Sequence, residues 1–287
     1  MVMMCALDVI FNYIFIFVLG MGTAGAAYGT AIAYALTMMS MVYYLVIHDK
    51  VLNFKQDDRL DFMPRLKILK KTFRIGSPIG IERGVMCTAQ IVISAIIAPL
   101  GTVAIAANTF AINVESLCYM PGHGIAEAAT TLVGQSKGAE RRDLMHSFAW
   151  ICMFLGMSIM ALMGGVMWLF APEMLCVITP DAEVLRLGTE ILRIEAWAEP
   201  GFAAAIVAMG VFVGAGKTLI PSLMNLASIW MVRLSLTLVL VPSMGLQGVW
   251  IAMAIELCFR GMIFILRLRT RGWSYIKDRS NMKIEKL

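Results

Sequence analysis

Four acidic residues stand inside long apolar stretches of this 287-residue sequence, and they are its first candidates for chemistry. Glu82, Glu115, Glu195 and Glu199 are each surrounded by runs rich in Ala, Ile, Leu, Met and Val. A carboxylate is costly to bury in an apolar medium, so an acidic residue in such a stretch usually faces a polar interior and serves function. It can exchange a proton, or bind Na+ where several oxygens converge. These four residues are our candidates for cation coupling, with static ion pairing as the structural alternative.

Other polar and aromatic residues in the same stretches could line a substrate cleft. Asn108 and Asn113 offer neutral ligands, although a buried Asn also serves as an interhelical hydrogen bond. Trp197 and Phe202 could stack on planar cationic compounds, or could instead face lipid. These four residues are our substrate-cleft candidates.

One acidic and one basic residue have the spacing of a helical ion pair. Glu256 precedes Arg260 by four residues, which places both on one face of a helix in the favourable order. The spacing predicts that this pair is structural.

Two prolines accompany the candidate carboxylates. Pro200 follows Glu199 directly and removes a backbone donor, which predicts a kink in the helix beside Glu195 and Glu199. Pro121 lies with two glycines just beyond Glu115 and predicts an interruption of that helix as well.

The stretch GVFVGAGKTLIPS, residues 210–222, invites comparison with a nucleotide-binding P-loop, but the spacing does not fit. The motif requires a glycine five places before Gly216, where this sequence has Val211. We therefore predict that this chain does not bind a nucleotide. The six cysteines and three histidines lack metal-ligand spacing, so no disulfide framework, cofactor or metal other than Na+ is predicted.

Composition identifies the elements that must position these residues as membrane-spanning helices. The sequence is 60% hydrophobic and 15% charged, with a mean hydropathy of +0.79, whereas soluble domains are about one quarter charged. A helix needs roughly 20 apolar residues to cross the hydrocarbon core. About eight such runs are present, and no alternating pattern of a barrel is seen. The runs cover residues 3–20, 24–47, 73–98, 103–128, 147–170, 190–213, 219–241 and 246–266.

The basic residues of the gaps predict the orientation, because cytoplasmic loops retain Lys and Arg. On the opposite side Arg186 is the only basic residue. Both termini of the chain are therefore expected in the cytoplasm, in a multi-pass protein of the cell membrane. The net charge of +5 reflects this orientation and contact with the bilayer, not nucleic-acid binding. The predicted cytoplasmic residues are Lys50, Lys55, Arg59, Arg65, Lys67, Lys70, Lys71, Lys137, Arg141, Arg142, Lys217, Arg267, Arg269, Arg271, Lys277, Arg279, Lys283 and Lys286.

A repeat connects the two ends of the sequence. Gly22 and Gly25 with the following Ala-Ile match Gly245 and Gly248 with the following Ala-Ile, at a constant offset of 223 residues. Transporters are commonly built from such repeats, so the first two runs are expected to take the role of the last two. A six-helix lobe would then begin near residue 73, and an equally long first lobe would need about 150 further residues and four helices before Met1.

Several stretches resemble the multidrug and toxic compound extrusion (MATE) family of cation-coupled exporters. SPIGIERG (77–84), APLGTVAIAANTFAINVESLCYMPGHGIAEAATTLVGQSKGA (98–139) and GVFVGAGKTLIPS are similar to its second lobe. LDVIFNYIFIFVLGMGTAGAAYGTAIA (7–33) is similar to the end of its first lobe. The resemblance implies four parts: the last two helices of the first lobe (1–47), a basic inter-lobe loop (48–72), a six-helix second lobe (73–268) and a basic cytoplasmic tail (269–287).

The resemblance implies an H+- or Na+-coupled antiporter that exports amphipathic or cationic organic compounds and drugs, and not an enzyme. The acidic site that the family carries in its first helices has no counterpart in this sequence, so the chain is expected to be a truncated copy whose partner is the missing amino-terminal lobe. The alternatives are a flippase for lipid-linked precursors, an inactive fragment or a partner subunit. A membrane enzyme is the alternative from another class, but it would require a nucleophile, a metal cluster or paired carboxylates near an interface, and three histidines without ligand spacing give it little support.

Overall fold

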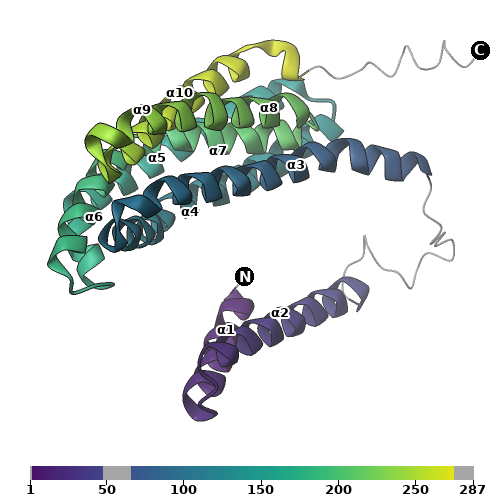
Figure 1. The fold of residues 1–287 in the computed structure, drawn as a ribbon. Helices are drawn as coiled ribbons and strands as arrows, with labels where there is room; N and C mark the ends of the chain where they lie inside the picture. Colours follow the sequence, from purple (N-terminus) through teal and green to yellow (C-terminus); the bar gives the residue numbers. More distant parts are fainter. Residues whose placement is uncertain (1, 48–65, 275–287) are drawn as a thin grey trace, which may run out of the picture. The chain divides into compact units, whose positions relative to one another are not determined.

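Helices form the part of the chain that the structure, a computed structural model, describes: residues 2–47 and 66–274 (Figure 1). The chain divides into two compact units, Met1–Leu66 and Lys67–Leu287, each of which is considered by itself. Residues 48–65 of the predicted inter-lobe loop lie outside the described residues. So do residues 275–287 of the predicted tail.

The first unit contains a hairpin of two helices. α1 (Val2–Tyr13) continues through a π-helical segment, η1 (Ile14–Val18), and then turns into α2 (Gly22–Ile47). The turn needs glycine, since Gly20 and Gly22 have φ angles of 64° and 55°. A Cβ on Gly25 would lie 2.7 Å from the carbonyl oxygen of Phe15, so a small residue is also required where the two helices approach.

The second unit is a bundle that contains the remaining helices. α6 and α7 follow one another with an angle of 60° between them, and together they are long and apolar enough for one bent span. The elements of this bundle are α3 (Leu66–Ile97), η2 (Ala98–Leu100), α4 (Thr102–Gly138), α5 (Arg142–Cys176), α6 (Ala182–Glu195), α7 (Glu199–Gly214), α8 (Leu219–Ala227), η3 (Ser228–Arg233), α9 (Leu234–Met244), α10 (Leu246–Arg269) and η4 (Arg271–Ser274).

The predicted all-helical, polytopic membrane architecture is confirmed. Within the described residues, six helices are long and apolar enough to cross a membrane, or seven spans if the bent pair is included. The remaining predicted span, 3–20, corresponds to the shorter apolar helix Met3–Val18. The helix predicted to start at residue 73 begins at Leu66, because the intervening Lys and Leu residues are good helix formers.

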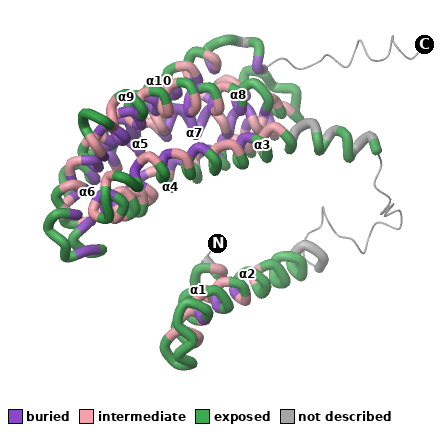
Figure 2. The backbone as a smooth tube through the Cα atoms, viewed as in Figure 1, coloured by how far each residue is buried: buried purple, intermediate pink, exposed green. Residues whose placement is uncertain are grey.

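The core of the second unit lies where α4, α5, α7 and α10 pack together (Figure 2). Small residues bring the backbones close: a Cβ on Gly210 or Gly214 of α7 would collide with the carbonyl oxygen of Ala126 or Thr130 on α4. The Thr130 hydroxyl donates a hydrogen bond of 2.9 Å to the carbonyl oxygen of Gly210. Close backbone contact of this kind is the usual way in which helices associate in lipid.

The turn between α9 and α10 repeats the geometry of the first hairpin. Gly245 has a φ of 57°, close to the value at Gly22. A Cβ on Gly248 would lie 2.7 Å from the carbonyl oxygen of Leu240 on α9. A Cβ on Gly25 would lie at the same distance from the carbonyl oxygen of Phe15. The two glycine pairs that match in sequence therefore have the same structural role.

The two predicted proline effects have different outcomes. The kink at Pro200 is confirmed, because α6 ends at Glu195 and α7 begins at Glu199. The interruption predicted at Pro121 is wrong, because α4 continues through it from Thr102 to Gly138. Pro121 removes one backbone hydrogen bond, but packing holds the helix on either side of it, since Gly122 lies against Met160 of α5.

Candidate functional site

A cavity of about 570 Å³ lies inside the second unit, between α3, α4, α7, α8, η3 and α10. Its volume falls within the range of about 300–1,000 Å³ that is typical of ligand pockets. Both signs of charge line it, set among aromatic and aliphatic side chains. The charged lining residues are Glu82, Glu115, Glu127, Arg83, Arg233 and Arg260.

Glu82 is presented to this cavity by α3 and is held by a partner on α8. Its Oε1 accepts a hydrogen bond of 2.6 Å from Nδ2 of Asn225, and both side chains are buried. Its Oε2 has no hydrogen-bond partner among the described residues. The carboxylate is thus fixed by one oxygen and keeps the other for a proton or a cation. Sequence reasoning did not include Asn225; an isolated Asn in the apolar run LIPSLMNLA was the available signal.

Glu115 lies at the middle of α4 and is also buried. The positive charge of Arg233, on the π-helical segment η3, acts on it across the cavity. The guanidinium of Arg233 also contacts Sδ of Met253. A π-helical turn shifts the register of the following side chains, and such turns occur frequently at functional sites.

Glu256 and Arg260 lie together on α10. Oε1 of Glu256 is 3.1 Å from Nε of Arg260, and the two side chains are 0% and 7% exposed. The same carboxylate oxygen accepts a hydrogen bond of 2.5 Å from the hydroxyl of Ser228. The guanidinium of Arg260 lies 5.5 Å from the ring centroid of Phe202, which also lines the cavity.

Glu195 and Glu199 stand at the two sides of the bend between α6 and α7, away from the cavity lining. Both are completely buried, and among the described residues none of their four carboxylate oxygens has a hydrogen-bond partner. The charge of Glu115 acts on Glu199, so the bend and the cavity are electrostatically connected. A Cβ on Gly164 would lie 3.1 Å from Cβ of Glu199, which shows how tightly α5 covers this carboxylate.

The four cleft candidates do not gather in one place. Asn108 lines the cavity and accepts a hydrogen bond of 3.1 Å from Nε1 of Trp250. Phe202 lines it too, whereas Asn113 is exposed and does not. The two asparagines are five positions apart along the helix, which places them on different faces of α4. Trp197 is 77% exposed and lines a separate groove.

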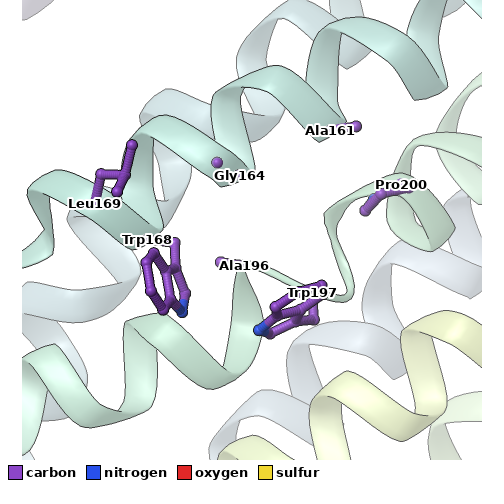
Figure 3. A pocket seen from close by; sticks show the side chains of 8 residues that line it. Ala161, Gly164, Trp168, Leu169, Ala196, Trp197 and Pro200 are labelled. Atoms are coloured by element: carbon purple, nitrogen blue, oxygen red, sulfur yellow. The ribbon is translucent and has the colours of Figure 1, made fainter.

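That groove has a volume of about 500 Å³ and is apolar (Figure 3). It lies between α5 and the linker that joins α6 to α7. We refer to it as the tryptophan groove. Its lining residues are Ala161, Gly164, Gly165, Trp168, Leu169, Ala196, Trp197 and Pro200.

The Gly-Lys-Thr element at residues 216–218 forms the turn between α7 and α8. Nζ of Lys217 donates a hydrogen bond of 2.5 Å to the carbonyl oxygen of Gly272, and Nζ of Lys137 donates one to that of Ala215. Burial lowers the pKa of Lys217, and the charges of Lys137 and Arg267 lower it further. These lysines are placed at the carboxyl end of α7, where cations are favourable.

The described residues contain no group of three or more His, Cys, Asp and Glu side chains arranged to hold a metal ion. The cavity thus combines single buried carboxylates with arginines and aromatic side chains.

Comparison with known proteins identifies the family. The family model MatE matches residues 78–239. The probable multidrug resistance protein NorM of Thermotoga maritima is 29% identical over 212 residues, which cover 73% of this chain and 46% of that protein. The NorM protein of Chromobacterium violaceum is also 29% identical, over 90% of this chain and 57% of its own length. The chain thus spans about half the length of these curated relatives.

A solved structure supports the same assignment at the level of the fold. A MOP-superfamily transporter from Pyrococcus furiosus matches with a TM-score of 0.86 at 22% identity, over 96% of this chain and 62% of that one. The charged cavity thus lies in a helical fold shared with known membrane transporters, and the family model covers more than half of the chain. This protein is a multi-pass membrane protein that belongs to the MatE family.

Proposed function

We propose that this protein takes part in cation-coupled export of amphipathic organic cations, including drugs, across the cell membrane. The observation that carries the proposal is the set of buried carboxylates around the cavity and the bend. Glu82 and Glu115 line the cavity, and Glu199 is enclosed beside a 60° bend without a hydrogen-bond partner among the described residues. An anion enclosed in this way is costly, so a proton or Na+ has to accompany it.

The bend gives the carboxylates a mechanical consequence. Uptake or release of a cation at Glu199 changes the charge at the point where α6 meets α7, and Pro200 leaves this junction without a continuous backbone ladder. A ligand can shift the balance between two conformations only if it binds them differently. A carboxylate buried at a bend meets this requirement, because straightening of the helix would change how far the carboxylate is buried and therefore its affinity for a cation.

The cavity lining supports the substrate class. Aromatic side chains at Tyr119 and Phe202 line the cavity and could stack on a planar cation, and Glu82 and Glu115 supply negative charge. Names of relatives point the same way, since the two NorM proteins are described as probable multidrug resistance proteins.

We propose that transport also requires helices that this chain does not contain. Alternating access uses two repeats that rock against each other, and the curated relatives are about twice as long as the matched region. We propose that a first lobe completes the pathway, and that both termini of this chain face the cytoplasm. The alternative within this proposal is a subunit that binds the substrate but cannot transport it without a partner.

The test is ethidium binding and ethidium movement by the full chain. Fluorescence anisotropy in detergent measures binding, and proteoliposomes with an imposed H+ or Na+ gradient measure movement. We expect saturable binding by the wild type and weaker binding by Glu82→Gln. Gradient-driven movement, in the chain or in the chain combined with a first lobe, should fall at least about tenfold in Glu199→Gln.

Glu173→Gln is the matched control, because Glu173 is an exposed glutamate near the end of α5 and outside the cavity lining. It should bind and move ethidium like the wild type. Binding without movement would identify the chain as a substrate-binding lobe. Absence of both from folded protein would refute the proposed function.

A lipid flippase is the second candidate, and a specific observation favours it. Three arginines, Arg83, Arg233 and Arg260, line the same cavity and would suit a phosphate-bearing head group. In that case the proteoliposomes should translocate a fluorescent lipid with a diphosphate head, while ethidium is not moved.

A further inference from the structure

The tryptophan groove lies on the outside of α5 and the α6–α7 linker, apart from the charged cavity. Trp168 and Trp197 place their indole rings on either side of Ala196, and Pro200 follows at the start of α7 (Figure 3). Both residues are exposed, Trp168 to 41% and Trp197 to 77%. Neither these rings nor the remaining lining, which is Ala, Gly, Leu and Pro, contributes a charge.

A cation stands at the edge of this groove. Arg193 is exposed on α6, and its guanidinium lies 5.4 Å from the ring centroid of Trp168. Its Nε donates a hydrogen bond of 3.3 Å to the carbonyl oxygen of Trp168. Among the described residues no carboxylate pairs with it, in contrast to Arg186 on the same helix, which lies 3.0 Å from Glu190.

The position of Arg193 places its charge near the external end of the predicted span 190–213. It lies on α6, which carries five charged residues among its 14 and leads into the bend. We therefore expect its guanidinium at the level of the lipid head groups. A charged residue at this level is costly in contact with hydrocarbon and is stabilised by an anion or by snorkelling towards head groups.

We propose that the tryptophan groove binds one acyl chain of an anionic phospholipid whose phosphate pairs with Arg193. The apolar lining suits a hydrocarbon chain, the two indoles suit the region beneath a head group, and the guanidinium binds phosphate with two donors. Apolar volume and a single cation at its edge together define a phospholipid better than a drug or a peptide.

The bound lipid would also stabilise the bend. One wall of the groove is α5, and the other is formed by Ala196, Trp197 and Pro200 of the bend itself. A lipid in the groove therefore contacts both sides of the junction, and it favours the conformation in which these residues lie next to α5.

The test uses dibrominated phosphatidylglycerol and dibrominated phosphatidylcholine, because bromine in an acyl chain quenches tryptophan fluorescence on contact. The purified full chain is titrated with each lipid in detergent micelles. Both lipids carry a phosphate, but the choline ammonium neutralises the head group of phosphatidylcholine and would repel Arg193. We therefore expect quenching to saturate at an about fivefold lower fraction of phosphatidylglycerol than of phosphatidylcholine. Replacing both reporters by Trp168→Phe and Trp197→Phe should remove the selective component, whereas Trp150→Phe, elsewhere on α5, should leave it.

Arg193→Gln should abolish the preference for phosphatidylglycerol, and Arg186→Gln, on the same helix, should retain it. Arg193→Lys keeps the charge without the fork of donors and should retain part of the preference. Inorganic phosphate should not compete, since it lacks the acyl chain. If Arg193→Gln does not fold, the comparison of the two lipids on the wild-type protein still tests the proposal.

Equal quenching by both lipids would mean an ordinary lipid annulus and would refute the proposal. If neither lipid quenches the fluorescence, another helix or a second copy of the chain covers the groove, and the proposal is refuted as well. A higher unfolding temperature in phosphatidylglycerol than in phosphatidylcholine, lost in Arg193→Gln, would support the effect on the bend.

Discussion

Arg260 is the residue whose charge can be tested most directly. It is the ionic partner of Glu256, and both side chains are almost completely enclosed. In Arg260→Gln the carboxylate would keep only its hydrogen bond from Ser228. Removing one member of a buried pair typically costs about 3–5 kcal/mol, because the other charge stays buried. We expect a loss of this size in equilibrium unfolding in mixed micelles.

Two further variants show whether the buried charge is the cause. Arg186→Gln breaks the exposed pair with Glu190 and should change stability by less than about 1 kcal/mol. The double variant Glu256→Leu with Arg260→Met removes both charges, so it should recover most of the loss. A double variant as unstable as Arg260→Gln would mean that side-chain packing, not charge, holds this site.

At the residue scale, local relationships could be predicted and relationships between helices could not. The spacing of Glu256 and Arg260 follows from the helical period alone. The hydrogen bonds of Asn225 to Glu82 and of Ser228 to Glu256 join different elements. Because membrane helices are apolar all around, the sequence does not indicate which face of α4 meets the cavity, and Asn108 and Asn113 were indistinguishable.

At the element scale, the crossing of α4 and α7 depends on two glycines. Gly210→Ala and Gly214→Ala would push a Cβ into the carbonyl oxygens of Ala126 and Thr130. Backbone cannot move aside as a flexible side chain can, so each variant should destabilise the second unit by about 1–3 kcal/mol. Thermal unfolding in detergent, followed by circular dichroism, measures the effect.

Gly124→Ala is the matched control on α4. A Cβ at Gly124 meets no atom within 4 Å, and alanine is the better helix former by about 1 kcal/mol. This variant should therefore be neutral or slightly more stable. Equal losses at Gly124 and Gly210 would show that helix flexibility, not close packing, is what the glycines provide.

The elements themselves were largely accessible from hydropathy, and the errors have identifiable causes. Apolar length located the helices, and Pro200 located the bend. The same argument failed at Pro121, because packing against α5 holds α4 straight enough to remain one helix. The polar amphipathic start of the sixth span was also missed: α6 begins at Ala182, where Asp181 caps it, rather than at residue 190.

At the scale of the whole molecule, the sequence predicts a fixed orientation in the membrane. Lys137, Arg141 and Arg142 cluster around the turn from α4 to α5, whereas the connection from α5 to α6 carries no basic residue, and the first one after it is Arg186 on α6. By the positive-inside rule the first turn should be cytoplasmic and the second external. Cys176, exposed at the end of α5, is a native reporter for the side that is predicted to be external.

The measurement is labelling of single-cysteine variants with a membrane-impermeant maleimide. With Cys176 as the sole cysteine, the protein should be labelled in intact cells. Ala139→Cys, at an exposed position between α4 and α5 in a cysteine-free background, should be labelled only after permeabilisation. Buried Cys152 as the sole cysteine should stay unlabelled in both conditions, because enclosure protects its thiol on either side. The reverse pattern for Cys176 and Ala139→Cys would invert the topology, and it would place the proposed lipid-binding arginine in the inner leaflet instead of the outer one.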